Sequence, residues 1–190
     1  MLNLQESLLI CIDAQEKLIN AMAEKERFLK NARILLKGVE ILSKNVDEAR
    51  RNPARQSQII FSEQYKKGLE NTHNALEIPH ATHFEKTTFS IFKDEEITNH
   101  IKRTRAKELI ICGIEAHICV LQSVFDALNL GYSVWVAEDA VTSRDLKNYK
   151  NAIELMRQFG AKITCAESAL FALMQDCKHK NFKEISALIK

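Results

Sequence analysis

Residues 109–137 read LIICGIEAHICVLQSVFDALNLGYSVWVA, and this stretch decides the fold. It opens with Leu109–Cys112, a run of β-branched and apolar residues that predicts a strand. After a turn that contains glycine, apolar residues recur at three- and four-residue steps over 120–128, which is typical of a helix. Gly131 predicts the end of that helix, and Val134–Ala137 predicts a second strand. A strand–helix–strand unit of this kind joins two parallel strands of one sheet.

The same alternation continues toward both ends of the chain. Leu8–Ile12 and Ile59–Phe61 predict two further strands, and continuous apolar runs of this length are typical of strands that are buried on both faces. Weaker strand candidates are Ala81–Phe84 and Lys162–Ala166. Helical patterns cover residues 16–44, 151–159 and 168–190, and the polar segment Asn45–Ser57 predicts an exposed loop. We therefore expect one α/β domain over residues 1–190, with helices covering a parallel sheet.

The composition is that of an ordinary globular protein, with 46% hydrophobic and 27% charged residues. A formal net charge of +2 is too small to indicate a nucleic acid or an anionic membrane as a partner. The sequence has no apolar run of the ~20 residues that a membrane span needs, and its start lacks the basic segment of a signal peptide. Five cysteines without a CxxC pair fit reduced thiols. We expect a cytoplasmic protein with no nucleic-acid or membrane partner.

Three chemically active residues follow three different predicted strands. Asp13 follows the first strand, Lys86 the third, and Cys119 the turn after the fourth. Ligands of an open α/β sheet bind beyond the carboxyl ends of its strands, so these side chains are expected at one edge. Each residue also has a structural interpretation: Asp13 could cap a helix, and Cys119 could be a buried helix cysteine. A helix N-terminus beside Cys119 favours a thiolate.

Several segments are similar to one known family. GIEAHICVLQSVFDALNLGYSVWVAEDAVTSR, residues 113–144, resembles the nucleophile segment of isochorismatase-like cysteine hydrolases. LLICIDAQEKL at 8–18 resembles the first strand of that superfamily, and EKTTFSIF at 85–92 resembles its lysine segment. SEQYKKGL at 62–69 and the tail 167–190 are most similar to the isochorismatase domain-containing branch. The resemblance implies a Rossmann-like three-layer fold with a six-stranded, mostly parallel sheet.

The resemblance also implies an activity and its residues. Asp13, Lys86 and Cys119 correspond to a catalytic triad in which Cys119 attacks a small amide, or a related acyl or imine compound, and forms a thioester. Lys86 and the helix N-terminus are expected to stabilise the thiolate, and Asp13 to accept and return a proton. A cis peptide bond is implied at Ile114–Glu115, which turns the Glu115 N–H toward the Cys119 N–H to form an oxyanion hole.

The resemblance places five further residues around a substrate: Gln15, Tyr65, Phe89, Phe92 and His117. Aromatic residues of an α/β protein also commonly pack in its core, so that alternative stays open for Tyr65, Phe89 and Phe92. For His117 two roles stay open: a pocket-wall or hydrogen-bonding role, and a transfer of protons to the reacting groups. The resemblance also implies a homo-oligomer, a dimer or a tetramer.

The sequence departs from two relatives within the superfamily. Nicotinamidases carry an Asp-x-His pair after the second strand for zinc, whereas this chain has Glu63-Gln64-Tyr65 and no histidine before His73. The six histidines show no metal-ligand spacing, so we expect neither a metal nor another cofactor. True isochorismatases lack the nucleophilic cysteine that Cys119 supplies here. The alternative to a hydrolase is a non-catalytic or redox-sensing protein in which Cys119 is a reactive thiol.

Overall fold

The computed structural model describes residues 2–44, 58–79 and 81–190, so the predicted loop Asn45–Ser57 lies outside the described residues. Its centre is a six-stranded sheet in the order β3-β2-β1-β4-β5-β6, in which every pairing is parallel. The strands are β1 (Ser7–Ile12), β2 (Ile59–Gln64), β3 (Thr82–Lys86), β4 (Glu108–Ile114), β5 (Ser133–Thr142) and β6 (Lys162–Thr164). This strand order is that of doubly wound α/β folds, so the predicted Rossmann-like architecture is confirmed.

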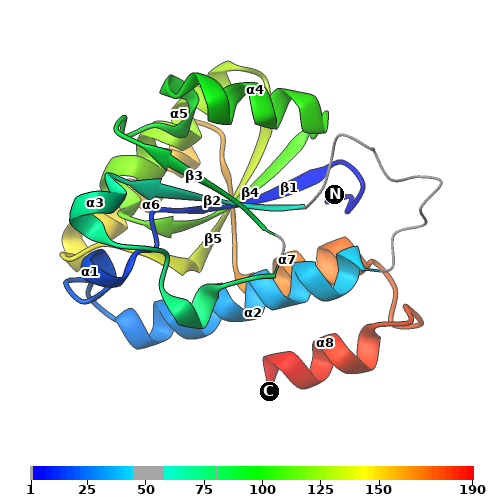
Figure 1. The fold of residues 1–190 in the computed structure, drawn as a ribbon. Coiled ribbons are helices and arrows are strands. Elements are labelled where there is room, and N and C mark those ends of the chain that lie inside the picture. The colour runs from blue at the N-terminus through cyan, green and yellow to red at the C-terminus, as the bar shows by residue number, and fades with distance from the viewer. Residues whose placement is uncertain (1, 45–57, 80) are drawn as a thin grey trace.

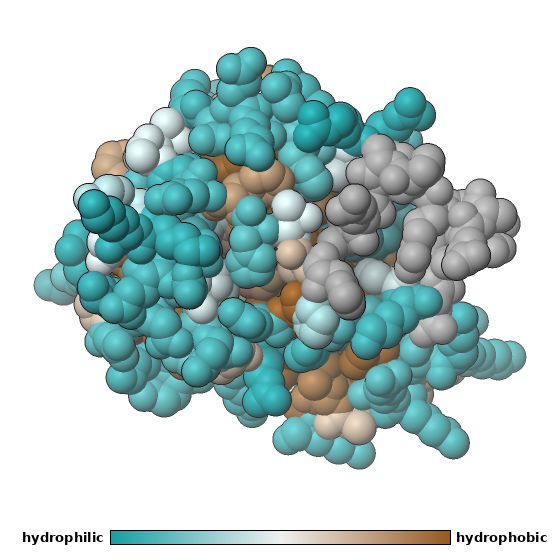
Figure 2. Space-filling view, in the orientation of Figure 1, coloured by the Kyte–Doolittle hydropathy of each residue, from teal (hydrophilic) through white to brown (hydrophobic). Residues whose placement is uncertain are grey.

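Helices cover both faces of the sheet, and Figure 1 shows the three resulting layers. One face carries α2 (Lys25–Ser43) and α7 (Ala166–Met174), with α8 (Phe182–Ile189) packed against both. The other face carries α4 (Glu95–Thr104), α5 (Leu121–Asn129) and α6 (Leu146–Gln158). The short helices α1 (Glu16–Ile19) and α3 (Lys66–Leu69) follow β1 and β2. Most apolar side chains face the sheet, and the surface in Figure 2 is mainly hydrophilic with a few apolar patches.

The central strands β1 and β4 are buried along their whole length. Leu9 and Cys11 of β1 pack in the core beneath α2, whereas Leu8 and Ile10 pack in the core beneath α5. Since successive side chains of a strand point to opposite faces, both sides of β1 must be apolar. This is why the strand has a continuous apolar sequence instead of an alternating one.

Some element boundaries differ from those that the sequence predicts. The expected helix over 16–44 is divided into α1 and α2, because Glu24 has a left-handed backbone (φ 49°) and begins a new helix. Helix α4 was not predicted, although the Asp94 carboxylate accepts a hydrogen bond from the Ile97 N–H (3.0 Å) as an N-cap. Strand β3 extends to Lys86, so this lysine is the last residue of a strand and its position is set by the sheet.

No helix of the described part of the chain combines the length and the hydrophobicity needed to cross a membrane.

Candidate active site

Three strand ends bring Asp13, Lys86 and Cys119 to one edge of the sheet. Asp13 directly follows β1 and has a left-handed backbone (φ 50°), while Lys86 ends β3. Cys119 lies in a π-helical turn, Ala116–Val120, between β4 and α5. Asp13 and Lys86 are buried, and Cys119 is only 7% exposed. The peptide bond between Ile114 and Glu115 is cis, as the resemblance implied.

Asp13 and Lys86 form a buried ion pair. The Lys86 Nζ lies 2.7 Å from the Asp13 Oδ2, and neither side chain is exposed to solvent. The other carboxylate oxygen, Oδ1, accepts a hydrogen bond from the Ser62 hydroxyl (2.7 Å). The Lys86 ammonium also donates to the Gln64 Oε1 (2.7 Å) and to the Thr88 carbonyl (2.9 Å). These extra hydrogen bonds offset the desolvation of two buried charges and hold them in one arrangement.

Two partners of this pair, Ser62 and Thr88, were not anticipated from the sequence. Ser62 of β2 is the register partner of Ile12, the residue before Asp13. Ser62 is the first polar residue after the apolar run Ile59–Phe61, and this change within the strand is a signal that could have indicated it. Thr88 contributes its backbone carbonyl, and because every residue has one, the residue type at position 88 could not indicate this contact. Asp13 itself does not cap a helix: the N-cap of α1 is Gln15, and the Asp13 carboxylate faces Lys86 instead.

The surroundings of Cys119 raise the pKa of its thiol. Burial raises its pKa most, and the negative charge of Asp13, which also forms a side-chain hydrogen bond with the thiol, raises it further. Lys86 lowers the pKa and Glu115 raises it, and the net result lies well above the ordinary value. Lys86 therefore acts in the expected direction, toward the thiolate, and the contribution of the helix N-terminus stays a prediction. Cys119 lies in the turn before α5, where desolvation outweighs the attraction of Lys86.

The turn that carries Cys119 is shaped by hydrogen bonds at both of its ends. The Glu115 carbonyl accepts from the N–H groups of Ile118 (3.0 Å) and Val120 (3.2 Å). The Ser123 hydroxyl donates to the Cys119 carbonyl (2.6 Å). These bonds fix the backbone on which the Glu115 and Cys119 N–H groups are carried. Their function as an oxyanion hole stays a prediction.

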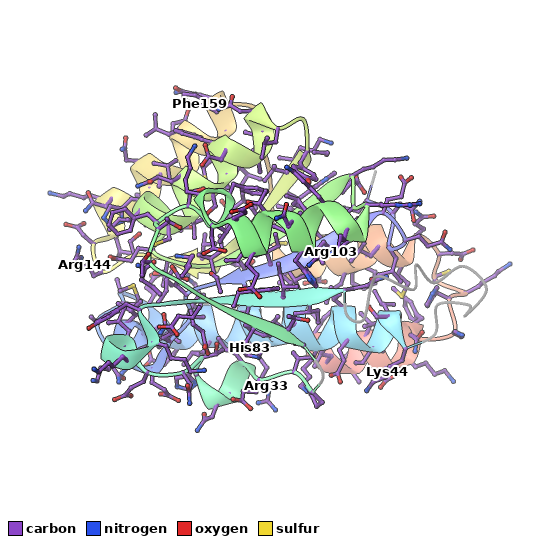
Figure 3. All side chains as sticks on the ribbon, turned by 45° about the horizontal axis from the view of Figure 1, so that its top comes forward. Arg33, Lys44, His83, Arg103, Arg144 and Phe159 are labelled. Atoms are coloured by element: carbon purple, nitrogen blue, oxygen red, sulfur yellow. The ribbon has the colours of Figure 1, made fainter. Side chains whose placement is uncertain are left out.

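The Glu115 side chain is bound to the end of β5. Its carboxylate accepts a hydrogen bond from the Arg144 backbone N–H (3.0 Å) and lies 3.4 Å from the Arg144 Nε. The Arg144 side chain is largely exposed and lies at the outer edge of the molecule in Figure 3. Beside it, the His117 Nδ1 lies 2.9 Å from the Ser143 hydroxyl, a partner that was not predicted. Both roles considered for His117 remain open, since this contact fixes the ring without assigning a proton transfer.

The three aromatic residues proposed for the pocket differ in exposure. Tyr65 and Phe89 are each 54% exposed, whereas Phe92 is half-buried and packs against the Tyr132 ring at a centroid distance of 5.8 Å. Phe92 therefore contributes to packing beside the site. Contact of Tyr65, Phe89 or Phe92 with a substrate stays a prediction.

Gln15 is fully buried, and its side chain is bound to backbone groups. Its Oε1 accepts from the Gln64 N–H (2.7 Å), and its Nε2 donates to the carbonyls of Gln64 (3.1 Å) and Glu70 (2.6 Å). This amide thus joins the end of β1 to the end of β2 and supports the wall of the site. A direct contact between Gln15 and a substrate remains a prediction.

The sequence resemblance places Glu63 at a zinc-ligand position of nicotinamidases, and in this structure its carboxylate has protein partners. Its carboxylate accepts from the Thr72 N–H (2.7 Å) and hydroxyl (2.9 Å), and it pairs with the Lys66 Nζ (2.9 Å). Burial opposes its ionisation, but the Lys66 and Thr72 contacts lower the pKa of the carboxyl overall. Within the described ranges no three His, Cys, Asp or Glu side chains form a group that could hold a metal ion. Metal independence stays a prediction.

Comparisons with known proteins identify relatives of this chain. Residues 7–168 match the family model of the isochorismatase domain. Isochorismatase family protein 1B of Dictyostelium discoideum is 44% identical over 139 residues, which are 70% of this chain and 67% of that protein. Isochorismatase domain-containing protein 2 of Danio rerio is 32% identical over 188 residues, 99% of this chain and 89% of that protein.

A solved structure is similar over almost the whole chain. The MAR1 ribonuclease from Caenorhabditis elegans superimposes with a TM-score of 0.86 at 32% sequence identity, covering 99% of this chain and 91% of that one. The matched domain, the relatives and the fold agree with each other and with the motifs around Asp13, Lys86 and Cys119. This chain is a member of the isochorismatase domain family.

Proposed function

We propose that this protein is a cysteine hydrolase that cleaves a small amide, or a related acyl or imine compound, through a thioester on Cys119. The observation that supports this proposal is the buried Asp13–Lys86 pair, with 2.7 Å between Nζ and Oδ2, beside the Cys119 thiol. A nucleophile next to a base that is itself oriented by a third group is the arrangement that covalent hydrolysis requires.

The first half of the reaction forms the thioester. As the Cys119 Sγ attacks the carbonyl carbon of an amide, Asp13 accepts the thiol proton, and the carbonyl electrons move onto oxygen. The backbone N–H groups of Glu115 and Cys119 donate to this oxyanion. Asp13 then passes the proton to the amide nitrogen, the C–N bond breaks, and the amine leaves. Lys86 remains protonated and holds the Asp13 carboxylate in place throughout.

The second half of the reaction removes the acyl group. Asp13 accepts a proton from a water molecule, whose oxygen attacks the thioester carbon. The intermediate collapses, the C–S bond breaks, and the sulfur takes back the proton from Asp13 as the acid is released. The raised pKa of Cys119 favours this final protonation. The enzyme thus returns to the thiol form in which the cycle began.

The environment of Cys119 favours this function over that of a redox sensor. Sensor cysteines are accessible and have a lowered pKa, because the thiolate is the form that reacts with oxidants. Cys119 is 7% exposed, and its pKa is raised. A sensor thiol also has no need of a buried carboxylate–ammonium pair beside it.

A substrate screen tests the proposal. Purified protein is incubated with a panel of small amides, released amine is measured, and intact mass spectrometry detects an acyl adduct on Cys119. We expect turnover of at least one amide, and none with Cys119→Ala. An RNA oligonucleotide belongs in the same screen, because the related C. elegans protein is described as a ribonuclease. Cleavage of RNA that depends on Cys119, without turnover of any amide, contradicts the proposal.

We further propose that the protein acts in the cytoplasm on a small molecule as a homo-oligomer, a dimer or a tetramer, without a cofactor. The exposed Phe159, which stacks on Phe125 with 4.0 Å between ring centroids, supports an association of subunits. In Figure 3 this residue lies at the outer surface, where a second subunit could cover it.

A further inference from the structure

The Lys86 ammonium has an acceptor for each of its three N–H groups. Its Nζ lies 2.7 Å from the Asp13 Oδ2, 2.7 Å from the Gln64 Oε1 and 2.9 Å from the Thr88 carbonyl. A lysine ammonium has three donors and no acceptor, and a neutral amine has only two donors. The three acceptors therefore use all three N–H groups of the ammonium, and in this arrangement they leave none for the sulfur of Cys119.

The orientation of the Gln64 side chain is determined by a second contact. Its Nε2 donates to the Thr87 carbonyl (2.8 Å), so the amide oxygen must be the atom that faces Lys86. The backbone of Gln64 is also held, because its N–H and its carbonyl are both bound by the buried amide of Gln15 (2.7 and 3.1 Å). Gln64 is thus a fixed acceptor next to Lys86.

We propose that Gln64 is a positioning residue whose amide oxygen holds Lys86 against Asp13 and away from the Cys119 sulfur. Cys119 then remains a thiol until a substrate is present, and Asp13 remains available as the base. This inference deepens the proposed function, and its meaning for catalysis depends on that function. The contacts of Lys86 from which the inference is drawn are independent of the proposed function.

The charged groups that act on the Cys119 thiol come from three parts of the fold. Asp13 after β1 and Glu115 before the turn raise its pKa, and Lys86 at the end of β3 lowers it. His117 in the same turn is bound to the Ser143 hydroxyl. A change at Gln64 that lets Lys86 move toward the sulfur must therefore favour the thiolate.

Alkylation of Cys119 by iodoacetamide, measured by mass spectrometry over a range of pH, tests this role without a substrate. Gln64→Met keeps the length of the side chain but removes the acceptor, so one Lys86 N–H can turn to the sulfur. We expect the pH midpoint of Cys119 alkylation to fall by about one to two units, the shift that a hydrogen bond to a charged group produces. Gln64→Glu keeps an oxygen beside Lys86 and adds a negative charge, so its midpoint should be unchanged or higher.

Two controls separate this effect from a loosened site. Gln122→Met changes a glutamine on the exposed side of α5 and should leave the midpoint unchanged, and the exposed Cys177 serves as the internal reference for reagent access. If the pH midpoint of Cys119 alkylation in Gln64→Met equals that of the wild type, the proposal is overturned. Equal shifts in Gln64→Met and Gln64→Glu also overturn it, because a general opening of the site affects both. If Gln64→Met does not fold, Gln64→Asn serves in its place. Its side chain is one methylene shorter, so the amide oxygen lies farther from Lys86, and the pH midpoint of Cys119 alkylation should fall.

The outcome is independent of the substrate screen. A lowered midpoint in Gln64→Met, together with no hydrolysis of any amide, supports the role of Gln64 and contradicts the proposed function. If an amide is hydrolysed, Gln64→Met should lower kcat more than it changes KM, because the base is affected and not the binding surface. Amide hydrolysis that is unchanged in Gln64→Met contradicts the positioning role alone.

Discussion

The Lys86 Nζ and the Asp13 Oδ2 lie 2.7 Å apart, and both side chains are completely shielded from solvent. Such a pair is stable only while both members are present, because removal of one leaves an uncompensated charge in the protein interior.

The ion pair therefore makes a prediction about stability. Lys86→Met should lower the free energy of unfolding by about 3–5 kcal/mol, since the Asp13 carboxylate loses its cation. The double variant Asp13→Asn/Lys86→Met should lose less than the sum of the two single variants, because neither charge remains. Urea denaturation of the four proteins measures both quantities. Strictly additive losses would show that the two charges do not interact.

The triad makes a prediction about activity. Cys119→Ala should abolish turnover of an amide substrate and leave the urea midpoint close to that of the wild type. Asp13→Asn should also reduce kcat by several orders of magnitude, because it removes the proton acceptor. Combining the two changes should reduce the rate little further, since groups that act as one unit give non-additive losses. Steady-state kinetics of the single and double variants test this, and residual turnover in Cys119→Ala contradicts a thioester mechanism.

The raised pKa of Cys119 makes a prediction about stability at alkaline pH. Its folded-state pKa lies above the unfolded value of about 8.5, so the thiol form stabilises the native state below that pH. As the pH rises above about 8.5, the unfolded chain ionises first and the native state loses stability, by up to about 1.4 kcal/mol per pH unit for one group. Wild type should lose more than Cys119→Ala in urea titrations across this range. The same loss in both proteins would contradict the assignment.

Metal independence is the fourth prediction. Glu63, which the sequence resemblance places at a zinc-ligand position of nicotinamidases, is bound by Thr72 and Lys66. Turnover should therefore persist in excess chelator, and metal analysis of the purified protein should find no stoichiometric zinc. Loss of activity in chelator that added zinc restores would contradict this expectation.

The fifth prediction concerns assembly. If the stacked Phe125 and Phe159 contribute to a subunit contact, light scattering of the wild type should give the mass of a dimer or a tetramer. Phe159→Asp should reduce that mass, and the exposed Lys67→Asp should not. A wild-type monomer at micromolar concentration removes the proposal of a homo-oligomer.

The architecture was predictable because it depends on local properties of the chain. Continuous apolar runs in β1 and β4 indicate strands covered on both faces, and their carboxyl ends indicate where a site must form. Asp13, Lys86 and Cys119 could therefore be selected as candidates, and the surrounding motifs indicated the family. Element boundaries were less accurate, since the break at Glu24 depends on a single left-handed residue.

The chemical state of the site was decided by the tertiary structure. Ser62 and Gln64 are brought to Asp13 and Lys86 by pairing between strands, and this proximity cannot be read from their spacing in the chain. In sequence, the turn that contains Cys119 looks suited to a thiolate, but burial and the charge of Asp13 raise the pKa of the thiol. The sequence by itself determined which residues reach the sheet edge, because hydrophobic periodicity is local. Only packing decided their hydrogen-bond partners and the pKa of Cys119, because desolvation and hydrogen bonding depend on groups that are distant in the chain.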